Sequence, residues 1–397
     1  MRAVGRVSIA GVLACLAMAG PAVADGPGVG TPTVVTLGDS AISGEAGRWA
    51  GNTNMSAWRV DALGSTAYWD TATGESIAGC HRSKAAQAHI GGGVASKNLA
   101  CSGARTSTGG TASGENFKPG IDFYSGPKGV GQALALQEYA RTHNVKAVVV
   151  MIGANNYGFA AIVERCVTNW ATSPSWWKNY CSDDSDMTSR FTATRQTTET
   201  NNVRAALQRV AQAMTNAGYA ASQYTILAQT YWSPVPRGDG MRYPESGWTR
   251  QSIGGCGVWN RDLNWANDTV VVAMNSTTIN AAATSGLPNV RVLDLQHSLD
   301  GRRLCERSVG LLEEVGLGSW QDAGAVDRTE WVSQIRTLTT ITGPYQLQED
   351  GHASYWGQKA MRNCLRLAFN GGAVRGGRCV RVANGLNARG EPQMELQ

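Results

Sequence analysis

The stretch Thr33-Val34-Val35-Thr36-Leu37-Gly38-Asp39-Ser40 decides the fold of this 397-residue chain. Its β-branched and apolar residues are typical of a buried strand, and Gly38 allows the backbone to turn sharply where that strand ends. A serine after such a turn lies at the rim of the sheet, where a base and a substrate can reach it. Ser40 is therefore a candidate nucleophile, although an ordinary polar turn after a strand has the same local sequence.

Four further short runs have the composition of buried strands, namely Lys97–Cys101, Val145–Ile152, Tyr224–Gln229 and Val290–Leu295. Helical patterns lie between and after them, at Gln132–Arg141, Glu199–Asn216, Arg261–Ala283 and Tyr355–Phe369. This alternation predicts an α/β fold, a three-layer α/β/α sandwich around a central parallel sheet of about five strands. We expect long surface loops at Arg105–Gly131, Val163–Thr194 and Pro234–Gly257.

Polar motifs follow the first three predicted strands. They are Gly38-Asp39-Ser40, Ser102-Gly103-Ala104 and Gly153-Ala154-Asn155-Asn156. Because ligands of parallel sheets bind beyond the carboxyl ends of the strands, we expect these motifs to form one site. Their joint placement favours a catalytic role for Ser40 over a plain turn.

The first residues have the pattern of a secretory signal peptide. A basic start with Arg2 and Arg6 precedes the apolar run Val7–Gly20, and Ala22-Val23-Ala24 forms a cleavage site. Cys15 leaves a lipoprotein signal open, but apolar residues continue beyond it. The apolar run is too short to span a bilayer, and no later run is long enough. We therefore expect a secreted protein with a signal peptide at 1–24, one domain at 25–383 and a flexible tail at 384–397.

Nine cysteines become eight once Cys15 is removed, and an even number in an exported protein favours disulfides. Pairing of sequence neighbours predicts the disulfides Cys80–Cys101, Cys166–Cys181, Cys256–Cys305 and Cys364–Cys379. Since neither Cys-x-x-Cys nor His-Glu-x-x-His occurs, we expect no metal site. Loss of the signal peptide lowers the formal charge from +5 to +3, and no Lys/Arg-rich run occurs, so a nucleic-acid partner is not expected.

A nucleophilic serine needs a base, and the chain has 5 histidines: His81, His89, His143, His297 and His352. His352 lies in a polar loop just before the last predicted helix, with Glu349 three residues earlier. We expect His352 to be the base and Glu349 to orient it, with Asp350 as the alternative acid at a less favourable spacing. His81 follows Cys80 and is expected to pack near a disulfide.

Four blocks of the sequence, taken in order, resemble the SGNH hydrolases, also called GDSL esterases and lipases. They are Leu37-Gly38-Asp39-Ser40, Asn98-Leu99-Ala100-Cys101-Ser102-Gly103-Ala104, Gly153-Ala154-Asn155-Asn156 and Glu349-Asp350-Gly351-His352. Three other stretches resemble secreted actinobacterial members in particular: Gln348–Gln358, Cys80-His81-Arg82-Ser83 and Glu330-Trp331-Val332. The similarity extends over nearly the whole chain after the signal peptide.

The resemblance implies an SGNH/flavodoxin-like fold and a carboxylic ester hydrolase that needs no cofactor. It implies that Ser40 is the nucleophile, His352 the base and Glu349 the orienting acid. It also implies an oxyanion hole made by the main-chain amides of Ser40 and Gly103 and by the side-chain amide of Asn155.

The chain departs from the family pattern at two positions. The family usually has aspartate where this chain has Glu349, and Asn-Asp where it has Asn155-Asn156. We expect Asn156 to lower activity or to alter a loop contact, without removing a catalytic group. No Gly-x-Ser-x-Gly occurs, so the nucleophile elbow of the α/β-hydrolase fold is absent from the sequence.

Three functions remain open at this point. An esterase or lipase acting on lipid or simple acyl esters is the first, and we expect it to be a monomer. A carbohydrate acetyl esterase is the second, because some of the 13 tryptophans, such as Trp170, Trp176 and Trp177, could stack on sugar rings. A non-catalytic secreted binding protein on the same fold is the third.

Overall fold

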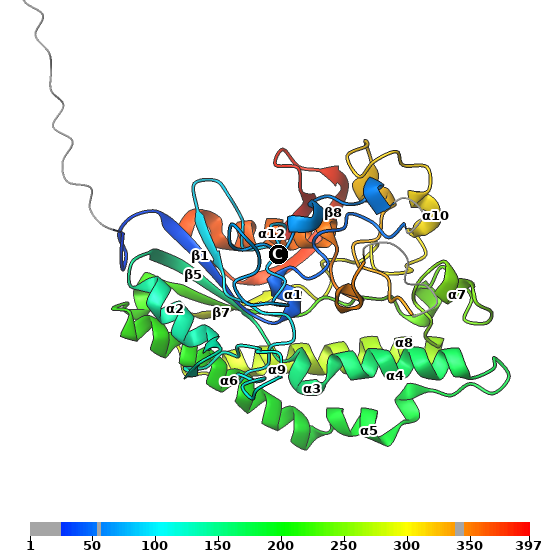
Figure 1. Ribbon diagram of the computed structural model, residues 1–397, viewed down its shortest axis with the longest axis horizontal. Coiled ribbons are helices and arrows are strands. Elements are labelled where there is room, and N and C mark those ends of the chain that lie inside the picture. The colour runs from blue at the N-terminus through cyan, green and yellow to red at the C-terminus, as the bar shows by residue number, and fades with distance from the viewer. Residues whose placement is uncertain (1–24, 54–56, 338–344) are drawn as a thin grey trace, which may run out of the picture.

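The computed structural model describes residues 25–53, 57–337 and 345–397, so the predicted signal peptide at 1–24 lies outside the described residues. At its centre is a seven-stranded sheet with helices on both faces (Figure 1). This arrangement confirms the predicted α/β fold. In the described part of the chain, no helix is both long enough and apolar enough to cross a bilayer.

The strands of the large sheet are β1 (Pro32–Gly38), β2 (Ala95–Asn98), β5 (Asn144–Met151), β6 (Thr225–Gln229), β7 (Val290–Asp294), β8 (Gly377–Leu386) and β9 (Pro392–Leu396). Their order is β2-β1-β5-β6-β7-β8-β9, and the strands from β2 to β8 pair in parallel. The first five match the five predicted strands to within a few residues and have a flavodoxin-like order. A separate hairpin consists of β3 (Ser125–Gly126) and β4 (Gly129–Val130).

The end of the chain differs from the flexible tail that we expect at 384–397. Strand β9 pairs antiparallel with β8, and Cys379 lies opposite Leu396 in this pairing. The side chains of Pro392 and Met394 are buried. Backbone pairing and this burial together hold the C-terminal residues against the sheet, so the sheet has two strands more than predicted.

The α-helices of the described residues are α1 (Ser40–Ser43), α2 (Gln132–Ala140), α3 (Ala154–Tyr157), α4 (Phe159–Thr172), α5 (Ser185–Thr188), α6 (Ala193–Asn216), α7 (Thr249–Ser252), α8 (Asn260–Trp265), α9 (Val272–Ala283), α10 (Leu311–Glu314), α11 (Ala325–Arg328) and α12 (Tyr355–Phe369). A π-helical segment, η7 (Ala266–Val271), joins α8 to α9. The four helices predicted from the sequence correspond to α2, α6, α8 with η7 and α9, and α12.

Helix α4 lies where the sequence predicts the long loop Val163–Thr194. Its buried residues include Ile162, Cys166 and Trp170, which recur every four residues and so form one apolar stripe. That stripe was present in the sequence, but the helix begins after Gly158 without a polar N-cap side chain. Because this start signal is missing, the sequence predicts a loop where the structure has a helix.

Alternate residues of the strands build two cores on opposite faces of the sheet. Val34 and Val149 belong to one core, and Val35 and Val148 belong to the other. Buried residues of α12 belong to the first core, whereas those of α2 and α6 belong to the second. Helix α12 accordingly lies on one side of the sheet, and α2 and α6 lie on the other (Figure 1). Burial on both faces explains why these strands have apolar runs instead of alternating patterns.

Four disulfides tie the loops to this body, and their pairing is the predicted one: Cys80–Cys101, Cys166–Cys181, Cys256–Cys305 and Cys364–Cys379. The first joins the long segment after α1 to the residues that follow β2. The last joins α12 to β8. Each closed loop restricts the unfolded chain and thereby stabilises the fold.

Strand β1 is the point at which the order of the sheet reverses, because β2 lies on one side of it and β5 on the other. In open α/β sheets, ligands bind at the carboxyl ends of the strands beside such a reversal. Gly38 ends β1 and is paired with Met151 at the end of β5. The residues that follow these two strands therefore meet at one edge of the sheet.

We predict that Gly38→Ala destabilises the fold and displaces the turn that carries Ser40. Gly38 has a φ of 143°, and an added Cβ would lie 1.9 Å from the carbonyl oxygen of Met151. We expect the free energy of unfolding, measured by urea denaturation, to fall by roughly 1–3 kcal/mol. Gly109→Ala is the control, because an added Cβ there has no neighbour within 4 Å. Equal unfolding midpoints for the two variants would contradict this prediction.

Candidate active site

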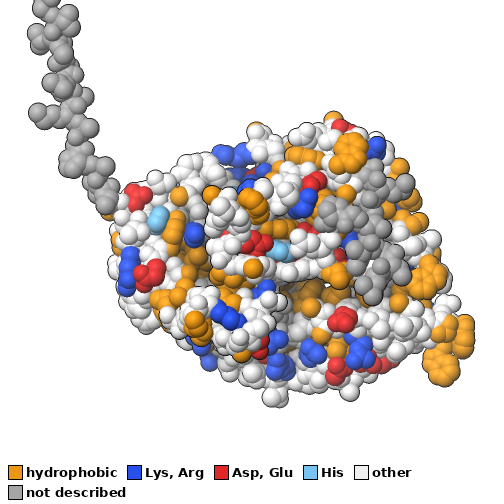
Figure 2. Space-filling view, viewed as in Figure 1, with side chains coloured by type: hydrophobic (Ala, Val, Ile, Leu, Met, Phe, Trp, Pro, Cys, Tyr) orange, Lys and Arg blue, Asp and Glu red, His pale blue; other side chains and the backbone are white. Residues whose placement is uncertain are grey.

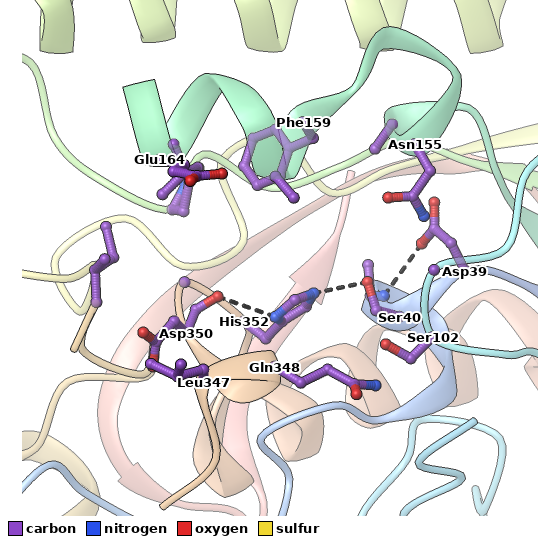
Figure 3. A pocket seen from close by; sticks show the side chains of 18 of the residues that line it. Asp39, Ser40, Ser102, Asn155, Phe159, Glu164, Leu347, Gln348, Asp350 and His352 are labelled. Atoms are coloured by element: carbon purple, nitrogen blue, oxygen red, sulfur yellow. Dashed lines mark hydrogen bonds between the residues drawn. The ribbon is translucent and has the colours of Figure 1, made fainter. Parts of the chain in front are cut away.

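Ser40 lies at the first residue of α1, directly after the turn at Gly38. The Asp39 side chain accepts a hydrogen bond from the main-chain nitrogen of Ala41 at 3.1 Å and so caps the helix. The main-chain nitrogen of Asp39 donates to the carbonyl oxygen of Met151 at 3.1 Å. These contacts fix the backbone on the N-terminal side of Ser40, whose side chain faces a pocket (Figure 3).

The hydroxyl of Ser40 and the imidazole of His352 form a direct hydrogen bond. The distance from Ser40 Oγ to His352 Nε2 is 2.6 Å (Figure 3). On the other side of the ring, Nδ1 lies 3.1 Å from the main-chain carbonyl oxygen of Asp350. A carbonyl oxygen can only accept, so Nδ1 carries the hydrogen and Nε2 is free to accept from the serine. This is the tautomer that a general base for Ser40 requires.

The carboxylate of Glu349 does not make the contact that we expect with His352. It accepts hydrogen bonds from Trp49 Nε1 at 2.8 Å, from the Tyr68 hydroxyl at 2.5 Å and from the Gln346 nitrogen at 2.9 Å. These donors hold Glu349 in a buried position, and burial raises its pKa. In place of the expected carboxylate, a main-chain carbonyl contacts the imidazole.

Asp350, the alternative acid, also fails to place its carboxylate on the imidazole. Its Oδ2 accepts from the Arg336 nitrogen at 2.7 Å, and its Oδ1 lies 3.6 Å from Arg336 Nη1. Burial raises the pKa of Asp350 to about 7. Only its carbonyl oxygen reaches His352, and any residue type carries that atom. No pattern of side chains could have identified this contact.

Of the three predicted oxyanion donors, Gly103 and Asn155 line the same pocket as Ser40, which carries the third, and as His352. Nδ2 of Asn155 donates to the carbonyl oxygen of Ala104 at 2.9 Å, which ties the third motif to the second. An amide nitrogen carries two hydrogens, so one remains for an oxygen in the pocket.

Asn156 turns away from the pocket and bridges two other elements. Its Nδ2 donates to Thr106 Oγ1 at 2.9 Å and to Glu199 Oε2 of α6 at 2.8 Å. Its Oδ1 accepts from the Thr106 nitrogen at 3.2 Å. Because Glu199 already supplies a buried carboxylate here, an aspartate at 156 would place two carboxylates side by side. The asparagine therefore fits its partner.

Tyr231 is a residue of the site that the sequence analysis missed. Its hydroxyl donates to Asp39 Oδ2 and accepts from the Ala154 nitrogen at 3.1 Å, so it joins the first motif to the third. Burial raises the pKa of Asp39 to about 7. A signal was available, since Tyr231 lies two residues beyond the carboxyl end of the predicted strand Tyr224–Gln229.

His81 does not line the pocket. Its Nδ1 is 2.6 Å from Glu45 Oε1, and its ring stacks on Tyr68 with centroids 4.4 Å apart. It is adjacent to the Cys80–Cys101 disulfide, as we expect. Across the described ranges, no group of three or more His, Cys, Asp or Glu side chains is arranged to hold a metal ion.

The pocket has a volume of about 790 Å³ and opens in the hollowed face of the molecule (Figure 2). Apolar side chains predominate on one wall: Phe159, Val163 and Val167 come from α4, and Trp232 and Met274 lie among the other lining residues. Glu164 and Thr168 of α4 also line the pocket, and both are exposed to solvent. The catalytic candidates lie along the same pocket. A group bound beside Ser40 can therefore extend over apolar side chains.

The pocket also has a polar region lined by Ser102, Asn116 and Lys118. The ammonium group of Lys118 donates to the carbonyl oxygen of Gly79 at 2.8 Å, and burial lowers its pKa. An added Cβ on Gly103 would lie 3.4 Å from Lys118 Cε, so the lysine stem packs against the predicted oxyanion hole. The pocket thus offers both an apolar and a polar region to a bound molecule.

Comparisons with known proteins find only distant likenesses. No family model and no curated protein matches the chain. Among solved structures, an extracellular lipase from Streptomyces rimosus is 18% identical, with 84% of this chain and 98% of that chain covered and a TM-score of 0.44. Phospholipase A1 from Streptomyces albidoflavus is 17% identical, with 85% and 99% covered and the same TM-score of 0.44.

A family two carbohydrate esterase from Clostridium thermocellum, solved as an active-site mutant, is 11% identical with a TM-score of 0.35. The alignment covers 86% of this chain and 63% of that one. Likenesses at this level carry no argument about the reaction. What the site does follows from its own geometry.

We predict that Glu349→Gln keeps most of the activity toward a simple ester. Loss of an orienting carboxylate typically costs about 10⁴ in kcat, but here the carboxylate is bound to Trp49 and Tyr68 and not to His352. We expect kcat to fall by less than about tenfold, through a small disturbance of the loop.

Tyr68→Phe is the matched control, because it breaks a hydrogen bond to the same carboxylate without changing its charge. Similar kcat values for the two variants are expected. A loss near 10⁴ for Glu349→Gln alone would show that the carboxylate orients His352 during the reaction.

Proposed function

We propose that this protein is an SGNH-type serine hydrolase that cleaves carboxylic esters. The observation that carries the proposal is the 2.6 Å hydrogen bond between Ser40 Oγ and His352 Nε2 at the wall of a 790 Å³ pocket. A serine bonded to an unprotonated imidazole nitrogen is an activated nucleophile. The amide groups of Gly103 and Asn155, which line the same pocket, supply hydrogen-bond donors for the oxyanion that forms when the serine attacks.

The proposed reaction has two half-reactions. Ser40 Oγ attacks the ester carbonyl carbon while its proton moves to His352 Nε2, and the amides of Ser40, Gly103 and Asn155 stabilise the oxyanion. When the tetrahedral intermediate collapses, the bond to the alkoxy oxygen breaks and His352 protonates the departing alcohol. Water then attacks the acyl-enzyme in the same way, with its proton passing through His352, and the carboxylic acid and Ser40 are released.

The carbonyl of Asp350 takes the place of the orienting acid in this mechanism. It fixes the ring and its tautomer through the 3.1 Å contact to Nδ1. A carbonyl dipole stabilises the imidazolium less than a carboxylate does, since it carries only a partial charge. The buried Glu45 carboxylate contributes a further electrostatic stabilisation of protonated His352.

The apolar wall of the pocket supports lipid or simple acyl esters as substrates. For a polysaccharide acetyl esterase, exposed aromatic faces should lie where the sugar chain passes. Trp176 and Trp177 are 81% and 73% exposed but do not line the pocket, and Trp170 is buried in the core. Trp232 does line the pocket, but only 5% of its surface is exposed, so it presents little of its ring to a sugar. The four disulfides fit an oxidising compartment and support export of the chain.

A fluorophosphonate probe tests the nucleophile. We expect the wild-type protein to be labelled at Ser40, because phosphonylation follows the same attack as acylation. Ser40→Ala should abolish both labelling and ester hydrolysis, whereas Ser107→Ala, a substitution of an exposed serine, should change neither. An unlabelled wild type would refute the proposal and favour a non-catalytic binding protein. Undiminished labelling of Ser40→Ala would refute Ser40 as the nucleophile.

The pH dependence of kcat/KM tests the base. Burial lowers the pKa of His352 below its ordinary value of 6.5, so the neutral ring persists to lower pH. We therefore expect kcat/KM to hold at pH 6.5 and to fall only as the pH drops further. A fall centred above 6.5 would contradict this assignment.

A second buried group, Asp39, has a pKa that is raised to about 7, so its protonation would also lower kcat/KM as the pH falls. This fall of kcat/KM at low pH is the acid limb of the pH profile. Asp39→Asn separates the two origins. The acid limb should remain in this variant at the same pH if it belongs to His352, and it should disappear if it belongs to Asp39.

A further inference from the structure

A second cavity lies directly behind the apolar end of the pocket. Its volume is about 70 Å³, and five residues line both spaces: Phe159, Val163, Pro234, Ile335 and Gly351. Gly351 precedes His352 in the chain. The wall between the two spaces therefore adjoins the catalytic candidates.

Apart from the shared residues, the lining of this cavity is mostly apolar. Ile162, Leu263, Val270 and Leu304 line it, and all four are buried. A cavity with such walls stays dry and takes up apolar groups.

The polar residues around the cavity already have partners within the protein. Asn267 donates to the carbonyl oxygen of Leu263 at 2.9 Å and accepts from Ser233 Oγ at 2.6 Å. Asp262 accepts from the main-chain nitrogens of Cys181 and Ser182 at 3.2 and 3.0 Å. Because these groups are satisfied, they do not call for a polar ligand.

The backbone changes its winding where it passes the cavity. The π-helical segment η7 contributes Ala266, Asn267, Val270 and Val271 to the lining, while the flanking α8 and α9 are regular. A π-helical turn is rare and occurs frequently at functional sites. Here the irregular segment coincides with an unfilled apolar space, so two independent observations mark the same place.

We infer that this cavity receives the distal end of the substrate's acyl chain, which passes from Ser40 along α4 and between Val163 and Ile335. The inference rests on the proposed ester hydrolysis and specifies its substrate class: esters of unbranched acyl chains long enough to reach beyond that passage. An acetyl group ends beside Ser40 and gains nothing from the cavity. A charged or hydroxylated chain end would lose its hydration in a space that offers no free partner.

A chain-length series tests this inference. The substrates are soluble p-nitrophenyl acetate, butyrate, octanoate and decanoate, each used below its micelle concentration. For the wild type we expect kcat/KM to rise by about fourfold per methylene that becomes buried, until the cavity is filled. The quantity compared between variants is the ratio of kcat/KM for decanoate to that for acetate.

Three variants change the space in opposite directions. Val163→Phe narrows the passage and Ala266→Leu fills the cavity, and each should lower the decanoate-to-acetate ratio by roughly tenfold, the loss of about two buried methylenes. Val163→Ala widens the passage and should raise the ratio. Ala161→Leu is the matched control, because Ala161 is on α4 but lines neither space, and its ratio should equal that of the wild type.

The outcomes separate this inference from the proposed function. If the wild type hydrolyses none of the esters, ester hydrolysis itself is refuted. If it hydrolyses acetate but the ratio is the same in Val163→Phe, Ala266→Leu and the control, the acyl cavity is refuted and the esterase stands. Circular dichroism verifies that each variant is folded, and the opposite sign expected for Val163→Ala distinguishes a specific effect from general destabilisation.

Discussion

The parallel pairing of β1 with β5 is the constraint on which the rest of the site depends. It places Gly38 opposite Met151, and the Asp39 nitrogen donates to the Met151 carbonyl oxygen at 3.1 Å. Since the two strands end together, the chain segments that follow them leave the sheet at the same edge. A shift of this register by one residue would reverse the faces of the side chains and separate Ser40 from Asn155.

Buried polar contacts then join the segments that leave the sheet. Thr36 donates to Asn98 Oδ1 at 3.1 Å, and Asn98 Nδ2 donates to the Ser43 carbonyl oxygen at 2.9 Å. Tyr231 connects Asp39 with the Ala154 nitrogen. Each of these groups would be costly to bury without its partner, so the network specifies one arrangement of the loops. The reactive groups are thus held in position by rigid elements before any ligand arrives.

The sequence was informative where a structural feature depends on side-chain type. The apolar runs predicted the strands, and the pairing of neighbouring cysteines predicted all four disulfides. It was uninformative where tertiary contacts decide. Helix α4 lacks a polar N-cap, and the C-terminal strand β9 gains its order from pairing with β8. The partner of His352 Nδ1 is a main-chain atom, and Glu349 is held elsewhere by Trp49 and Tyr68.

The carbonyl of Asp350 that contacts His352 has a consequence for how the site tolerates change. A carboxylate in this role can be protonated or lost by a single base substitution, and the histidine then loses its orientation. A peptide carbonyl does not take up a proton in the physiological pH range, and every residue type has one. The orientation of the base therefore depends on the path of the loop. Neither acid nor a side-chain substitution at this position removes the contact for as long as the loop keeps its shape.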